Sequence, residues 1–169
     1  MPTLQGALAR LRPATEADIP ALAKIRQTPE VYVWWRGGSD LVAAIEEDLN
    51  EHGVNAYVIE AEDRVVGWIQ THTEPDPDYR HASIDIYVDP AVHGRGIGTD
   101  AVRTLARHLF VEEGHHRVII DPAVDNAAAI RSYSKVGFKP VGVMRKYERG
   151  ADDSWHDNLL MDLLAEELS

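Results

Sequence analysis

The stretch SIDIYVDPAVHGRGIGTDAVRTLARHLF, residues 83–110, decides the fold of this chain. Its first residues alternate between polar and apolar side chains, which predicts a strand with Asp85 on one face and Ile84, Ile86 and Val88 on the other. Apolar residues at helical spacing predict an amphipathic helix in its last part. Glycines at alternate positions, Gly94, Gly96 and Gly98, connect the two. Such a turn brings free backbone N–H groups close to a ligand, so the stretch predicts an anion site suited to pyrophosphate.

Three alternatives exist for this glycine-rich turn. A tight connection without a ligand needs nothing beyond the glycines themselves. A Rossmann dinucleotide site needs the turn in the first βαβ unit, whereas here it comes in the middle of the chain, after an antiparallel run. A Walker A loop is excluded because no Lys-Ser/Thr pair follows the last glycine. The strand before the turn and the helix after it favour anion binding.

Outside this stretch the pattern predicts helices and strands in mixed order. Thr15-Glu16-Ala17-Asp18 resembles a capping box that begins one helix, a second helix follows Ser39, and a later one begins at Asp125 as its cap and ends at Gly137. The predicted strands are 56–60 and 65–71, joined by a turn at Glu62-Asp63, then 83–88, 118–120, and a closing hairpin of 138–146 and 155–163. This order predicts an α/β fold of the α+β type, in which one central, mostly antiparallel mixed sheet carries helices on both faces, as a single domain over residues 1–169.

The composition limits the chemistry. The chain has 169 residues and no cysteine, so disulfides, thiolate metal sites and a cysteine nucleophile are excluded. The histidines show no metal-ligand spacing, so no metal is expected. His115 and His116 follow Gly114 in a turn and are expected to face solvent. The net charge of −11 disfavours nucleic acid as a partner and slightly favours a cationic substrate.

The sequence shows no signal peptide and no run of the roughly 20 apolar residues that a membrane span needs. We therefore expect a cytoplasmic protein without a membrane partner. A free sheet edge or the closing hairpin would allow two chains to pair, so both a monomer and a homodimer are open.

Two motifs carry a family resemblance. The segment from Val88-Asp89-Pro90 to Thr99 resembles the acetyl-coenzyme A motif of the GNAT acetyltransferases, and the segment 126–138 resembles the second motif of the same superfamily. The likeness covers roughly residues 10–165 and implies the GNAT fold and an acetyl-CoA-dependent N-acetyltransferase. His93 departs from the family pattern, which often has Gln or Arg there. The backbone supplies most of that turn's N–H groups, so we expect the function to survive the departure.

The chain also has a narrower resemblance, to the aminoglycoside 6'-N-acetyltransferases. It is carried by Trp34-Trp35 with the Gly pair beside them, by Ile84-Asp85, and by Asp121-Pro122 followed by Asp125-Asn126. In that family the aspartates that match Asp85 and Asp121 lie in the substrate cleft. The cofactor-binding residues that the resemblance implies are Tyr87, Val88, His93, Gly94, Arg95, Gly96, Ile97, Gly98, Thr99, Asp121, Asn126, Ala129 and Tyr133. Asn126 would hydrogen-bond the cofactor arm or cap its helix.

The reaction requires that an amine lose a proton before it attacks a thioester. Asp85 is the candidate base, directly or through one water, and the alternative is a surface aspartate. The resemblance implies that Tyr133 protonates the leaving thiolate, although its spacing also suits a core-facing residue. It also implies that a backbone N–H near Tyr87 or Val88 donates to the oxyanion, where two strands splay. Without a cysteine, no acyl-cysteine forms, and direct transfer in a ternary complex is expected.

The predicted acceptor-binding residues are Trp34, Trp35, Glu74, Asp85 and Asp121. The tryptophans would form a wall for a sugar ring or pack a helix. Glu74 would extend an acidic cleft or lie in a solvated loop. Asp121 would bind an ammonium or cap the turn before Pro122.

Three functions are compatible with this sequence. They are acetyl transfer to an aminoglycoside amine (the 6'-amine, conferring resistance), the same chemistry on kasugamycin or another antibiotic, a polyamine or a peptide N-terminus, and a non-catalytic acyl-CoA-binding sensor.

Overall fold

The computed structural model describes residues 1–169 and contains one open sheet of eight strands, in the order β1-β2-β3-β4-β5-β6-β8-β7. All neighbouring strands are antiparallel except β5 and β6. The strands are β1 (Leu4–Gln5), β2 (Arg10–Pro13), β3 (Val54–Ala61), β4 (Arg64–Thr73), β5 (Ala82–Val88), β6 (Arg117–Ile120), β7 (Lys139–Arg149) and β8 (Trp155–Leu164). The predicted mixed, mostly antiparallel sheet is confirmed.

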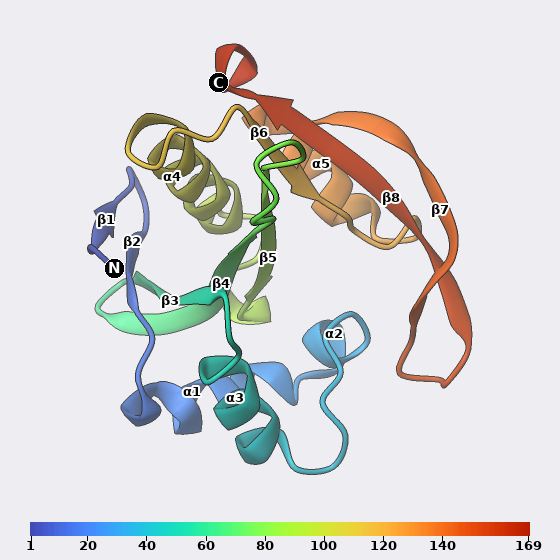
Figure 1. Ribbon diagram of the computed structural model, residues 1–169. Coiled ribbons are helices and arrows are strands. Elements are labelled where there is room, and N and C mark those ends of the chain that lie inside the picture. Colours follow the sequence, from blue (N-terminus) through green and yellow to red (C-terminus); the bar gives the residue numbers. More distant parts are fainter.

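Helices cover both faces of this sheet, as predicted (Figure 1). The first three helices, α1 (Ile19–Arg26), α2 (Pro29–Tyr32) and α3 (Leu41–Leu49), share a buried cluster with Val58, Trp68 and Tyr87. The other two helices, α4 (Ile97–Val111) and α5 (Ala127–Val136), share the larger cluster with residues of the opposite face such as Ile84. None of these helices is long and apolar enough to cross a membrane.

The alternation predicted for residues 83–88 decides which cluster each side chain enters. Ile84 is buried against α4 and α5, while Tyr87 is buried among α1, α2 and α3. Asp85 shares the face of Tyr87 but stays exposed. One strand therefore carries core residues for both layers and presents a carboxylate where the α1–α3 layer leaves the sheet open.

The parallel pair β5–β6 is joined only at its beginning. Ala82 pairs with Val118 and Ser83 with Ile119, and no pairing follows. Beyond these residues the two strands diverge, as Figure 1 shows beside α4 and α5. The later part of β5 therefore has one edge without a neighbouring strand, and this edge leads directly into the glycine turn.

The closing hairpin contains the largest irregularity in the sheet. Residues 145–147 of β7 lie opposite Asp157 alone, because the register shifts between Met144↔Asn158 and Glu148↔His156. Lys146 adopts a left-handed backbone (φ 48°), and its N–H donates to the Asp157 carboxylate (2.7 Å). A bulge of this kind bends a strand and redirects the side chains that follow it.

Several local predictions need correction. Asp125 does not cap α5: Asn126 is the cap, and its side-chain oxygen accepts the N–H of Ala129 (3.2 Å). His115 is buried (3 % exposed), since its backbone N–H bonds Leu109 at the end of α4, whereas His116 is exposed as expected. The strands β1 and β2 and the short helix α2 were not predicted.

A buried carboxylate explains why the N-terminal hairpin folds onto α4. Asp100, in the first turn of α4, accepts the backbone N–H groups of Ala7, Leu8 and Ala9 at 3.2, 2.8 and 3.0 Å. Gly6 permits this approach, because a Cβ there would lie 2.3 Å from a carboxylate oxygen of Asp100. The β1–β2 loop is thereby held beside the glycine turn.

Candidate active site

The glycine turn has the backbone that the sequence predicts. Gly94 and Gly96 take left-handed conformations (φ 74° and 80°), which glycine adopts without strain. Gly98 lies in the first turn of α4, where an added Cβ would come within 3.4 Å of Val88 Cγ2. The turn therefore needs glycine twice for its conformation, and at Gly98 because the helix packs closely on β5.

The backbone N–H groups from Gly94 to Thr99 have no partner within the protein. Six consecutive free donors at the start of a 15-residue helix, where the helix dipole is positive, form an anion site. The side chains around this turn are held by other groups. Arg95 pairs with Glu62, and the His93 ring donates from Nε2 to the Val88 carbonyl (2.8 Å). The free N–H groups of the turn are suited to a pyrophosphate.

The unpaired edge of β5 offers one further donor. The Asp89 N–H bonds Val66 of β4 (2.7 Å), so the preceding residue, Val88, directs its N–H and carbonyl away from β4. His93 occupies that carbonyl, and no strand reaches the Val88 N–H because β6 pairs only with Ala82 and Ser83. The Val88 N–H therefore lies at the end of β5, and the short turn Pro90–Val92 separates it from the free N–H groups that begin at Gly94.

Helix α5 places Tyr133 beside this edge. Asn126 caps the helix, and a hydrogen bond between Thr99 and Ser132 (2.7 Å) ties it to the first turn of α4. Tyr133 is 9 % exposed, its ring is 6.3 Å from that of Phe138, and its hydroxyl makes no hydrogen bond to another side chain. Burial, then the charges of Asp85 and Asp121, raise the pKa of Tyr133, so the phenol stays protonated.

Asp85 belongs to a short chain of polar side chains across β4 and β5. The indole N–H of buried Trp68 donates to the Gln70 carbonyl oxygen (2.9 Å), which turns the Gln70 amide so that its NH₂ faces Asp85 Oδ2 (3.4 Å). Desolvation is the largest influence on Asp85 and raises its pKa, and the charges of Glu148 and Glu51 raise it further, while Gln70 and His72 oppose them. Asp85 thus combines an open face with a raised pKa.

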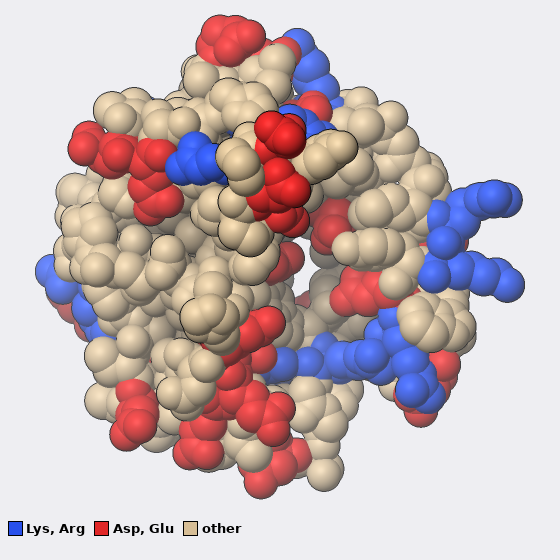
Figure 2. Space-filling view, viewed as in Figure 1, with Lys and Arg blue, Asp and Glu red and all other residues tan.

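Three carboxylates are linked through their charges: Asp85 on β5, Asp121 just after β6 and Glu148 on β7. The Asn158 amide of β8 joins the Asp121 backbone to the Glu148 carboxylate. Desolvation, then the charges of Asp85 and Glu148, raise the pKa of Asp121 to about 6, against hydrogen bonds from Tyr147 and Asn158. Figure 2 shows the molecule hollowed between the β4–β5 part of the sheet and the β7–β8 hairpin, with acidic side chains around the opening. We call Asp85, Asp121 and Glu148 the carboxylate cluster.

The other predicted acceptor residues have different positions. Trp35 packs edge-on against Tyr87 (4.9 Å between ring centroids) under Arg26, whereas Trp34 is exposed. Asp85 and Tyr87 share one face of β5, so Trp35 lies on the Asp85 side of the sheet. Glu74 is not among the charges that act on Asp85 or Asp121, and its carboxylate accepts the N–H of Asp76 (3.1 Å). Glu74 therefore belongs to its own loop.

Sequence reasoning missed Tyr147, Glu148 and Asn158 as members of this site. Their local sequence is that of an ordinary edge hairpin, and no motif marks them. Asn158 follows His156 and Asp157 in the polar first part of β8, so its sequence context hides that it is 1 % exposed in the structure. A buried polar residue of this kind commonly orients a neighbouring group.

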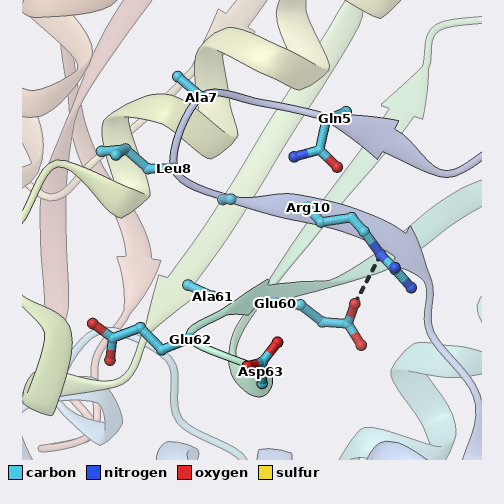
Figure 3. Close-up of a pocket in the computed structure, with 9 residues that line it drawn as sticks. Gln5, Ala7, Leu8, Arg10, Glu60, Ala61, Glu62 and Asp63 are labelled. Atoms are coloured by element: carbon cyan, nitrogen blue, oxygen red, sulfur yellow. Dashed lines mark ion pairs between the residues drawn. The ribbon is translucent and has the colours of Figure 1, made fainter.

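A surface hollow of about 460 Å³ lies elsewhere (Figure 3). Its walls are the β1–β2 loop and the β3–β4 turn, with none of the predicted site residues among them. The acidic Glu60 in its wall is already paired with Arg10 (3.0 Å) and Arg12 (2.7 Å). This hollow contains neither the free N–H groups of the glycine turn nor any member of the carboxylate cluster.

Comparison with known proteins identifies the family of this chain. Residues 9–139 match the model of the acetyltransferase (GNAT) domain. The chain is 28 % identical over 153 residues to the aminoglycoside N(6')-acetyltransferase type 1 of Klebsiella pneumoniae, covering 79 % of this chain and 75 % of that protein. It is 41 % identical over 78 residues to the N-alpha-acetyltransferase RimI of Mycobacterium tuberculosis, covering 45 % and 47 %.

Solved structures show the same fold. Mycobacterium smegmatis RimJ in complex with CoA-disulfide superposes with a TM-score of 0.85 at 24 % identity, over 99 % of this chain and 88 % of that one. The structure of AAC(6')-Ib in complex with ribostamycin and coenzyme A superposes with a TM-score of 0.78 at 24 % identity, over 95 % of both chains. Relatives on this fold thus differ in the acceptors that their names give.

Proposed function

The chain belongs to the GNAT acetyltransferases and is an N-acetyltransferase that uses acetyl-CoA, and from this premise we propose that its acceptor is the 6'-amine of an aminoglycoside. The observation that carries the proposal is the carboxylate cluster beside the unpaired edge of β5. A polycationic amino sugar supplies the positive charge that these three groups lack. The relative from Klebsiella pneumoniae, which matches along most of both chains, is named for this reaction. Acetylation at that amine would confer resistance.

Bound acetyl-CoA supplies an acetyl group activated as a thioester. The free N–H groups from Gly94 to Thr99 would hold its pyrophosphate, and the Val88 N–H would donate to its thioester carbonyl oxygen. Asn126 and Ala129, at the start of α5, would contact the cofactor arm. The acetyl group would then lie at the unpaired edge of β5.

Asp85 accepts the proton of the acceptor ammonium, directly or through a water, and so frees its lone pair for attack. Desolvation raises the pKa of Asp85, which makes its carboxylate a stronger base than that of a free aspartate. Tyr133, kept protonated by its surroundings, delivers a proton to the departing thiolate. Direct transfer between the two bound substrates needs no covalent enzyme intermediate, and no cysteine is present to form one.

A panel of amines tests the acceptor. Thiol release from acetyl-CoA is measured with kanamycin, tobramycin, neomycin, paromomycin, kasugamycin, spermidine and short peptides. Neomycin and paromomycin form a matched pair that differs in the 6' group, an amine in the first and a hydroxyl in the second. We expect turnover of kanamycin, tobramycin and neomycin and none of paromomycin.

The other outcomes select the other functions. Turnover of peptides, spermidine or kasugamycin alone would retain the acetyltransferase and remove the aminoglycoside assignment. Acetyl-CoA binding without turnover of any amine would favour a non-catalytic sensor.

The Gln70 amide sets the pH at which Asp85 works. Its hydrogen bond to Asp85 lowers the pKa of that carboxyl, against desolvation and the charges of Glu148 and Glu51. Gln70→Ala removes this influence, so the pKa of Asp85 rises and more of it is protonated at a given pH. We expect the acid limb of the kcat/KM–pH profile to move to higher pH, with activity recovering above the limb. A uniform loss at every pH would assign Gln70 a packing role instead.

A further inference from the structure

The β7 bulge gives Glu148 its position. Because residues 145–147 lie opposite Asp157 alone, the strand rejoins its partner at Glu148↔His156 after a local excursion. The bulge is stabilised by a hydrogen bond, because the N–H of left-handed Lys146 donates to the Asp157 carboxylate. A lysine in this conformation carries a strain that persists only where the surroundings impose it.

Asn158 fixes the Glu148 carboxylate. Its amide nitrogen donates to Glu148 Oε2 (2.8 Å) and to the Asp121 backbone carbonyl (2.8 Å), which joins β8, β7 and the end of β6. Asn158 is 1 % exposed, and the oxygen of the same amide has no partner. The protein thus buries an amide with an unused acceptor directly against the Glu148 carboxylate. A ligand that reaches Glu148 therefore meets a carboxylate whose position is held by a buried amide.

The carboxylate cluster lacks a resident cation. Some acids elsewhere in the chain do have a basic partner, for example Asp18 with Arg12 (2.7 Å), Asp48 with Arg26 (2.6 Å) and Asp162 with Arg117 (3.0 Å). None of the ion pairs formed by its basic side chains involves Asp85, Asp121 or Glu148. Like charges held together without a counter-ion favour the binding of a cation from outside.

We infer that Glu148 and Asp121, with Asn158 orienting Glu148, form a second ammonium subsite, so that the enzyme selects acceptors with at least two positive charges. Asp85 receives the amine that reacts, and the second subsite holds another ammonium of the same molecule. This inference rests on the proposed function for its aminoglycoside form. The second subsite would bind any acceptor with two or more ammonium groups, so it does not depend on the acceptor being an aminoglycoside.

Calorimetric binding to the protein loaded with coenzyme A tests the subsite without turnover. Kanamycin and spermidine carry several amines, and 6-amino-6-deoxyglucose and 1-aminobutane carry one. We expect Glu148→Gln to weaken kanamycin or spermidine binding by about 10- to 100-fold, as for loss of a charge-assisted contact, and to change monoamine binding little. Glu148→Asp keeps the negative charge but loses the contact with Asn158. Its affinity for kanamycin or spermidine should therefore lie between those of the unsubstituted protein and of Glu148→Gln. Glu112→Gln, at an exposed acid after α4, removes the same charge far from the site and should change nothing.

The outcomes separate this inference from the proposed function. Equal weakening of polyamine and monoamine binding, or no weakening of either, would overturn the second subsite. Absence of polyamine binding to the unsubstituted enzyme would also overturn it. Polyamine binding that depends on Glu148, without acetylation of aminoglycosides, would retain the subsite and reject the aminoglycoside assignment. Unchanged acetyl-CoA affinity and melting temperature show that the variants are folded.

Discussion

Replacement of Asp85 by asparagine is expected to lower kcat/KM for the amine acceptor by about 10²- to 10⁴-fold, the range of a positioned general base. The asparagine side chain has the same shape but cannot take a proton from an ammonium. Asp85 is exposed on the sheet face and makes one long contact with Gln70 (3.4 Å), so the substitution should leave the fold intact. The loss is measured as thiol release at fixed pH with saturating acetyl-CoA.

Two further measurements identify the cause of that loss. Acetyl-CoA affinity should change little, because its pyrophosphate is bound by the N–H groups of the glycine turn. Asp78→Asn, at an exposed aspartate of the β4–β5 loop, makes the same chemical change away from the cluster and should keep full activity. A variant that loses acceptor affinity alone, with kcat unchanged, would make Asp85 a binding group and leave the base unassigned.

Tyr133→Phe is expected to lower kcat by about 10²-fold while acetyl-CoA binding stays nearly the same. The hydroxyl makes no hydrogen bond to another side chain, so its removal breaks no contact of the folded protein. The ring keeps its packing with Phe138. A group that only delivers a proton to the thiolate affects the rate and not the binding of the cofactor. The measurement compares single-turnover rates with the dissociation constant for acetyl-CoA.

A packing role for Tyr133 predicts a different result. If acetyl-CoA affinity and the melting temperature fall together with the rate, the residue is structural. If the rate is unchanged, another proton donor serves the thiolate. Tyr147 is then the next candidate for the proton donor. It lies beside Asp121, and the charge of Asp121 is the largest influence that raises the pKa of Tyr147.

The glycine turn was predictable because its signals are local. The strand, the left-handed glycines and the helix after them lie in one continuous stretch, and the unpaired N–H groups from Gly94 to Thr99 follow from that geometry. The cap of α5 was predictable only to within one residue. Asp125 and Asn126 both have side chains suited to capping, and a turn in which the Asn126 N–H bonds Ala123 decides between them.

The acceptor side depended on contacts between distant segments. Trp34 and Trp35 have the same local sequence context, but buried Arg26 bonds the backbone of Trp35 and Arg36 and so turns Trp35 onto Tyr87. The exposed side chain is therefore Trp34. No pattern within residues 33–38 carries this information.

The sequence by itself determined the order of the elements other than β1, β2 and α2, together with the two faces of β5 and the anion turn, because each follows from the conformational preferences of neighbouring residues. It also determined that Asp85 would face away from the larger core. Only the tertiary structure decided that β5 and β6 part after Ser83, and that Glu148 joins Asp85 and Asp121. These features depend on the register of strands far apart in the chain, and register is set by packing and by a bulge that a single strand's sequence does not reveal.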